Sequence, residues 1–135
     1  MNTRVIVSAV IEKDDQILFG KKKTNAGPYP NTWHLIGGGL NEGESLEDAI
    51  QREIREEANI EVDIVESLGF DEDIEPNKHG EPTHYVFLVF KAVYLSGQIT
   101  ANDDIVELSW IHKSELATIP LNKPSIKLFQ KMRYL

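Results

Sequence analysis

The segment 46–58 constrains the fold more than any other, because it combines an amphipathic helix with carboxylates on the apolar face. Its apolar residues recur at helical spacing and define one stripe: Leu46, Ile50 and Ile54. At about 100° per residue, Glu53 and Glu57 fall inside this stripe and Glu56 lies at its flank. The sequence therefore predicts a helix that packs on a core and carries acidic groups at the edge of that core.

Glutamates in an acidic helix usually form a solvated charge run, but their phase argues against that interpretation here. A carboxylate in a partly buried stripe is costly unless it is paired or binds a cation. Two or three neighbouring carboxylates also repel one another, and a cation relieves this repulsion. Mg²⁺ fits best, because it prefers hard oxygen ligands and is commonly shared between carboxylates and substrate phosphates.

Six apolar or alternating segments are predicted to be strands. They cover residues 4–11, 16–21, 33–36, 60–70, 84–95 and 105–111. A polar loop is expected over 71–83, a short helical turn over 114–117 and a closing helix over 125–133. For the central helix, Ser45 is a good N-cap and Asn59 suits a left-handed C-cap. This order of elements predicts an α/β fold.

Length and composition exclude several classes of protein. Residues 1–135 are about the size of one domain, and 14 Lys and Arg against 22 Asp and Glu give a net charge of −8. This charge argues against binding to long nucleic acid. The absence of cysteine excludes a disulfide framework, a thiolate zinc site and cysteine catalysis. No stretch approaches the roughly 20 apolar residues of a membrane span, so we expect a single cytoplasmic domain without a membrane partner.

Three consecutive glycines, Gly37, Gly38 and Gly39, stand just ahead of the carboxylate helix. Backbone without side chains can approach a ligand closely and turn its carbonyl or N–H groups toward it. A glycine triplet alone is equally compatible with a tight loop. Its position next to the acidic helix favours a role in binding.

The glycines and the helix together resemble the Nudix box. The chain reads Gly38, five residues, Glu44, seven residues, and then Arg52-Glu53-Ile54-Arg55-Glu56-Glu57-Ala58-Asn59-Ile60. This matches the pattern Gly-x5-Glu-x7-Arg-Glu-aliphatic-x-Glu-Glu-x-Gly-aliphatic at every position but one. Asn59 replaces the last glycine, and Asn also tolerates the left-handed conformation. Ile36 stands where many members have a proline.

The resemblance implies an α/β/α sandwich around a mixed sheet and a Mg²⁺ cofactor, with Mn²⁺ as a substitute. The matching metal ligands are the carbonyl of Gly37 and the side chains of Glu53, Glu56, Glu57 and Asp104. Asp104 belongs to the acidic loop before the second tryptophan, where Asp103 and Glu107 are alternatives and a purely solvated loop is as compatible. Arg52 is expected to pair with Glu44 and to support the loop and the helix.

The same resemblance implies the reaction. Water attacks one phosphorus of a diphosphate in line, without a covalent intermediate, and the branch closest in length, the MutT-like hydrolases, takes its base from the residue matching Glu53. Lys23 and the backbone of Gly38 are expected at the substrate. Asn122 is expected to read the edge of a purine base, although a role at the start of a helix explains it equally well. The preferred substrate is a purine nucleoside triphosphate, cleaved to the monophosphate and pyrophosphate.

Other substrates remain open within this chemistry: ADP-ribose or a nucleotide sugar, a dinucleoside polyphosphate, or the 5′ end of RNA. The spacing of Pro76 resembles that of ADP-ribose hydrolases, although turn chemistry also accounts for a proline there. The alternative of another class is a nucleotide-binding module without activity. The complete set of box carboxylates favours an enzyme instead. A homodimer is compatible with such a domain.

Overall fold

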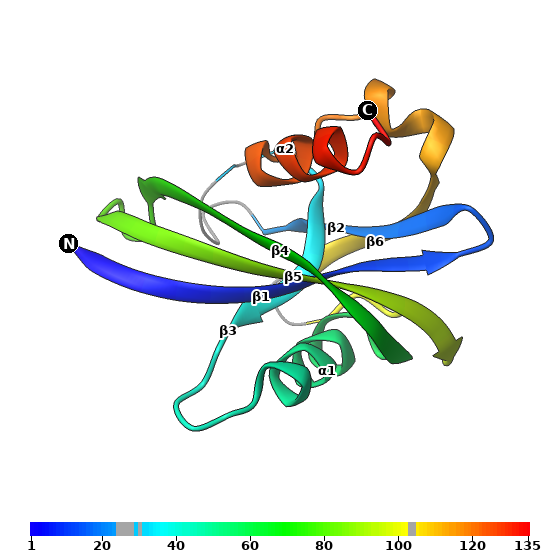
Figure 1. The fold of residues 1–135 in the computed structure, drawn as a ribbon, viewed down its shortest axis with the longest axis horizontal. Helices are drawn as coiled ribbons and strands as arrows, with labels where there is room; N and C mark the ends of the chain where they lie inside the picture. Colours follow the sequence, from blue (N-terminus) through cyan, green and yellow to red (C-terminus); the bar gives the residue numbers. More distant parts are fainter. Residues whose placement is uncertain (24–28, 30, 103–104) are drawn as a thin grey trace.

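A six-stranded sheet separates two helices, with α1 on one face and α2 on the other (Figure 1). The computed structural model describes residues 1–23, 29, 31–102 and 105–135. The strands are β1 Asn2–Lys13, β2 Gln16–Lys22, β3 His34–Gly39, β4 Glu61–Pro76, β5 Pro82–Ser96 and β6 Ile105–His112. The helices are α1 Leu46–Ala58, the 3₁₀ helix η1 Lys113–Thr118 and α2 Lys123–Lys131. The predicted α/β/α sandwich is confirmed.

The sheet is mixed, and its strand order is β4-β5-β1-β3-β2-β6. β1 pairs parallel with β5 and antiparallel with β3, and the other pairings are antiparallel. β1 lies between two hydrophobic clusters. Val7, Ala9 and Ile11 face the cluster that contains α1, and Val10 faces the cluster that contains α2. This explains the nearly continuous apolar sequence of β1, because both of its faces are covered.

Helix α1 has the predicted bounds and caps. The Ser45 hydroxyl accepts a hydrogen bond from the Asp48 N–H at 3.2 Å, and Asn59 has φ 61°, in the left-handed region. The predicted apolar stripe was wrong at its first member, because Leu46 is 38% exposed. The buried face begins one turn later, at Ala49 and Ile50, and it does include the glutamates at 53 and 57.

The polar loop expected over 71–83 is largely strand. β4 continues to Pro76 and β5 begins at Pro82, so only five residues, 77–81, connect them. In β4, Asp71, Asp73 and Glu75 share one face. Lysines of α2 lie opposite them: Lys127 is 3.4 Å from Asp71, and Lys123 is 3.4 Å from Asp73. The prediction of a loop was wrong because the ion pairs with α2 and the pairing to β5 stabilise a strand even though its residues are mostly polar.

Helix α2 starts two residues earlier than predicted. Asn122 is its N-cap, with Pro124 in the first turn. The N–H of Asn122 donates to the carbonyl of Trp33 at 3.1 Å, and Trp33 bridges Leu121. These contacts fix the start of α2 beside the beginning of β3. Within the described ranges, no helix has the length and apolar character needed to span a membrane.

Candidate active site

A cavity of about 430 Å³ extends from the acidic face of α1 to the start of α2. Its acidic end contains Glu53, Glu56 and Glu57 together with the glycines of β3. Its other end contains aromatic and amide side chains: His34, Tyr85, Phe87 and Asn122. A volume of this size suits a small ligand with a charged part and an aromatic part. The two chemical characters meet along the glycine strand β3.

Glu53 is the buried carboxylate at the acidic end. It is 8% exposed, and an ideal Cβ placed on Gly38 would stand 2.4 Å from its Oε2. The carboxylate therefore fills the space that glycine leaves open. Burial raises the pKa of Glu53 above its ordinary value, although Arg52 donates to its Oε1 at 2.8 Å and opposes the shift. A carboxylate with a raised pKa is a better proton acceptor near neutral pH.

Glu57 lies one turn further along α1 and is 4% exposed. Its Oε1 accepts a hydrogen bond from the Gly37 N–H at 3.0 Å. Gly37 cannot carry a side chain, because an ideal Cβ there would stand 2.1 Å from the Val7 carbonyl oxygen of β1. The packing of β3 against β1 therefore fixes the position of the Gly37 N–H that donates to Glu57.

Arg52 and Glu44 form the expected pair. The guanidinium donates from Nε to Glu44 Oε2 at 2.7 Å and from Nη2 to Oε1 at 2.9 Å, and Nη2 also donates to the Gly39 carbonyl at 3.0 Å. The bidentate contact holds the pKa of Glu44 below its usual value. Arg52 therefore connects the loop after β3 to the helix and holds one oxygen of Glu53, as a supporting residue.

The oxygen donors at this end fit a hard divalent cation. Glu53 Oε2 faces Gly38 without an intervening side chain, and Glu57 lies on the same helix face. Glu56 is half-exposed and 3.4 Å from Arg52 Nη1. In the part of the chain that the structure describes, no three acidic or histidine side chains already converge on one point. Bonds to Arg52 and Gly37 hold Glu53 and Glu57 in their present directions.

The two remaining predicted ligands are Asp104 and the carbonyl of Gly37. Asp104, like its neighbour Asp103, lies outside the described residues, and the third alternative, Glu107, is exposed on β6. For Gly37, the structure shows its N–H bonded to Glu57, and this contact does not test its carbonyl. The glycine strand lines the cavity at Gly38, and the predicted contact of Gly38 with substrate stays a prediction.

The basic residues at the cavity differ from the sequence prediction. Lys22 lines the cavity, whereas Lys23 is exposed and does not. The positive charge of Lys22 lowers the pKa of both Glu53 and His34, which places it near both ends of the site. Sequence reasoning missed Arg4, which also lines the cavity with its guanidinium over Gly39. Strand alternation placed Arg4 on one face of β1, but only the fold brings that face to the site.

Asn122 caps α2 and also lines the cavity, and its reading of a base edge stays a prediction. Its Oδ1 accepts from the Ser125 N–H at 3.1 Å, so the prediction of a residue at the start of a helix is confirmed, and it also lines the cavity. Tyr85 and Phe87 of β5 stack on each other with centroids 6.1 Å apart and line the cavity as well. They give the cavity an aromatic wall beside the amide.

Comparisons with known proteins agree with this fold and site. Residues 2–132 match the NUDIX domain. The chain is 30% identical over 129 residues to the nucleoside triphosphatase NudI of Enterobacter sp. (strain 638), covering 91% of this chain and 92% of that protein. It is 33% identical over 128 residues to NudI of Salmonella newport (strain SL254), covering 90% and 91%. The chain therefore belongs to the NUDIX family of hydrolases.

Solved structures give the same result. The crystal structure of a MutT NUDIX hydrolase from Burkholderia pseudomallei has a TM-score of 0.82 at 29% identity, covering 96% of this chain and 98% of that chain. The MutT protein of Methanosarcina mazei Go1 has a TM-score of 0.83 at 20% identity, which supports the fold alone. The sequence-based assignment to a MutT-like Nudix hydrolase is confirmed.

Proposed function

We propose that this hydrolase is a divalent-cation-dependent nucleoside triphosphate pyrophosphohydrolase, which releases a nucleoside monophosphate and pyrophosphate. One observation carries the proposal: the buried carboxylate of Glu53 faces the bare backbone of Gly38 in a cavity whose other end has an aromatic wall and an amide. Relatives that are named nucleoside triphosphatase NudI support the choice of substrate.

The carboxylates of α1 would hold the cation. Glu53, Glu56 and Glu57 would bind Mg²⁺, or Mn²⁺ in its place, with the Gly37 carbonyl and Asp104 as further ligands. A cation held there would supply charge neutralisation at the phosphoryl oxygens and a place for the water that attacks in line. Glu53, whose carboxylate lies against the bare backbone of Gly38, would take the proton of the attacking water. The water oxygen bonds to phosphorus while the phosphorus–oxygen bond to the leaving phosphate breaks.

Lys22 and Arg4 supply positive charge for the phosphates. Both line the cavity, and neither forms an ion pair with another described residue. A free guanidinium or ammonium beside buried carboxylates attracts a polyanion that neutralises it. Lys23, the predicted phosphate contact, remains a weaker candidate because its side chain is exposed outside the cavity lining.

The aromatic end fits a nucleobase, for which the preferred proposal is a purine. Tyr85 and Phe87 offer a flat apolar surface, and Asn122 contributes a polar amide to the same cavity. An aromatic wall with a few fixed polar groups is the usual composition of a site for a flat heterocycle. Asn122 thus selects the base, while the residues of α1 act on the phosphates.

A substrate panel tests the proposal. The protein is incubated with Mg²⁺ and, separately, nucleoside triphosphates, ADP-ribose, nucleotide sugars and dinucleoside polyphosphates, and the products are separated by chromatography. Monophosphate and pyrophosphate from a triphosphate are the expected products. Cleavage of ADP-ribose alone would identify the alternative substrate, and binding without cleavage of any compound would identify a module without activity.

Metal dependence is measured separately from activity. Titration with Mg²⁺ or Mn²⁺ is expected to raise the melting temperature of the wild-type protein, because a ligand that binds only the folded state stabilises it. Chelation should reverse the shift. Glu53→Gln should weaken the shift, whereas Glu47→Gln, on the exposed first turn of the same helix, should leave it unchanged.

A further inference from the structure

The amide of Asn122 is held at both of its ends. Its Oδ1 accepts from the Ser125 N–H at 3.1 Å, and its Nδ2 lies 3.3 Å from Nδ1 of His34. All three residues are buried, with exposed fractions of 8% or less. A backbone N–H can only donate, so the atom facing Ser125 must be the amide oxygen. The amide therefore has one orientation, and its NH₂ group faces His34.

The other nitrogen of His34 fixes the tautomer of the ring. Nε2 lies 3.2 Å from the Tyr29 carbonyl oxygen and 3.2 Å from Thr32 Oγ1. The carbonyl can only accept, and the Thr32 hydroxyl donates its own hydrogen to the same carbonyl at 2.6 Å. Both neighbours therefore accept from Nε2, which must carry the hydrogen. Nδ1 is left with a lone pair, and Asn122 Nδ2 donates to it.

The neutral form of the ring is the stable one here. Burial, aided by the positive charge of Lys22, lowers the pKa of His34 to about 4. A protonated ring would place a second N–H against the NH₂ group of Asn122, where neither group can accept. The amide cannot turn to resolve this conflict, because its oxygen caps α2 at Ser125.

These bonds fix where the amide can donate and where it can accept. One hydrogen of Nδ2 is used by His34 and one of the two lone pairs of Oδ1 is used by Ser125, so one Nδ2 hydrogen and one lone pair remain on a residue that lines the cavity. A freely rotating asparagine could exchange the two groups. This asparagine keeps its oxygen at the first turn of α2 and its remaining donor on the side of His34, which also lines the cavity.

We propose that His34 is a positioning residue that holds the Asn122 amide as a hydrogen-bond donor, so that the site selects nucleobases with a carbonyl oxygen at the recognised edge. Bases with an amino group at the same place are disfavoured, because two donors would face each other. The inference rests on the proposed function and narrows its substrate class to triphosphates of keto bases.

Two substitutions separate the two nitrogens of His34. In His34→Asn, the amide oxygen takes the place of Nδ1 and still accepts from Asn122. In His34→Gln, the amide nitrogen takes the place of Nε2 and still donates to the Tyr29 carbonyl, but the acceptor for Asn122 is lost. Both variants remove the same ring, so a merely structural role for His34 would affect them alike.

The readout is the ratio of kcat/KM for bases that carry a carbonyl or an amino group at the same position, with the matching change at the adjacent ring nitrogen: ITP against ATP, and UTP against CTP. The wild-type protein is expected to favour the carbonyl base of at least one pair by tenfold or more. His34→Gln should reduce that ratio about tenfold, mainly through a higher KM for the carbonyl base, and His34→Asn should keep it within about threefold. Equal ratios in the wild-type protein, or equal losses in the two variants, would overturn the inference.

The tautomer is measured without any substrate. In ¹⁵N-labelled protein, long-range ¹H–¹⁵N correlation spectra distinguish Nε2–H from Nδ1–H rings, and the spectrum of His34→Asn identifies the signals of His34. A neutral Nε2–H ring from pH 6 to 8 is expected, and an Nδ1–H or protonated ring would contradict the inference. If the wild-type protein hydrolyses no nucleoside triphosphate, the proposed function fails. If it hydrolyses both bases of each pair equally, only the selection of keto bases fails.

Discussion

The buried carboxylate of Glu57 accepts the backbone N–H of Gly37 across 3.0 Å, and this bond joins α1 to β3 at the centre of the site. Gly37 is buried, and Glu57 provides the acceptor that its N–H uses. A residue expected to bind a cation therefore also completes the backbone hydrogen bonding of the fold.

This bond makes a prediction for Glu57→Ala. If repulsion among the glutamates were the only effect, removing one of them would leave the stability unchanged or raise it. Because the structure shows the Gly37 N–H bonded to Glu57, we expect the variant to lose about 1 to 3 kcal/mol of unfolding free energy in metal-free buffer. Glu57→Gln retains an acceptor and should lose less. Urea denaturation of both variants in chelator tests this, and equal stability of Glu57→Ala and the wild-type protein would contradict it.

Glu53→Gln should fold normally and lose about 10² to 10⁴ in kcat, because an amide neither accepts the proton of water nor binds a cation well. Removing a buried negative charge should leave the melting temperature unchanged or slightly raised, since burial opposes ionisation at this position. Steady-state kinetics with the best triphosphate measures the loss. Glu47→Gln, on the exposed turn, is the matched control, and a similar loss there would remove the assignment to Glu53.

The three glycines should respond differently to alanine. At Gly37 a new Cβ meets the backbone of β1 at 2.1 Å, so Gly37→Ala should be strongly destabilised. At Gly38 the three atoms nearest to the new Cβ all belong to the Glu53 carboxylate, the first at 2.4 Å, so activity should fall about 10²-fold with a smaller loss of stability. At Gly39 it meets the flexible end of Arg4 at 2.7 Å, and the effect should be the smallest of the three. Measuring the melting temperature and kcat/KM of the three variants tests this, and a different order of losses in stability or activity would contradict the prediction.

His34 should make stability depend on pH. The pKa of His34 is about 4 in the folded protein and near 6.5 in an unfolded chain, so the unfolded state binds more protons between these values. The unfolding free energy should therefore fall as pH decreases from 6.5 to 4, by on the order of 3 kcal/mol from this group. Denaturant titrations at several pH values measure the slope. His34→Asn should lack the part of the slope that comes from His34. The carboxylates contribute to the slope of both proteins, so identical slopes in the variant and the wild-type protein would exclude His34 as the source.

The sequence by itself determined the helix and its chemistry. The phase of Glu53 and Glu57 in the stripe of α1 and the caps at Ser45 and Asn59 are local properties of the chain, because helical spacing alone decides which residues share a face. The match of the Nudix box gave the family for the same reason, since its residues all lie in one continuous segment. The pairing of Arg52 with Glu44 also follows from this short span.

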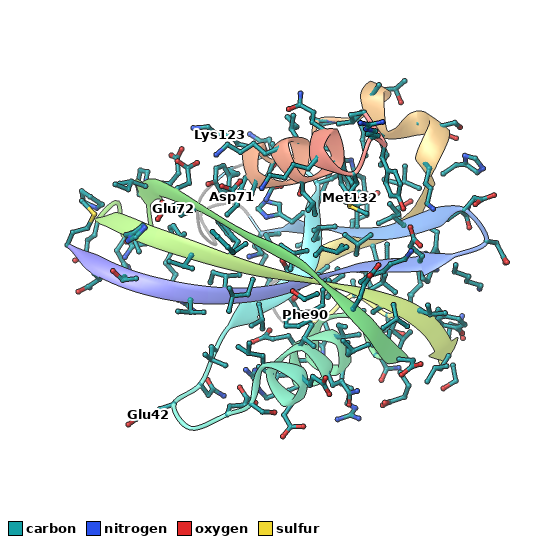
Figure 2. The ribbon with its side chains drawn as sticks, in the orientation of Figure 1. Glu42, Asp71, Glu72, Phe90, Lys123 and Met132 are labelled. Carbon is teal, nitrogen blue, oxygen red and sulfur yellow. The ribbon has the colours of Figure 1, made fainter. Side chains whose placement is uncertain are left out.

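Only the tertiary structure decided the rest of the site. Arg4 and Lys22 reach the cavity because β1 and β2 lie on opposite sides of β3 in the sheet, and no local pattern encodes that order. The strand at 71–76 depends on pairing with β5 and on lysines of α2, about fifty residues away in the sequence. Figure 2 shows Asp71 on β4 and Lys123 on α2 as parts of these two facing elements.

The orientation of Asn122 depends on His34, which is 88 positions away in the sequence, and on the tautomer that Tyr29 and Thr32 impose on that ring. From the sequence alone, an asparagine can donate or accept a hydrogen bond. The group that it presents to a ligand is set by partners that the folded chain brings within hydrogen-bonding distance. Such partners leave no periodic signal in the sequence.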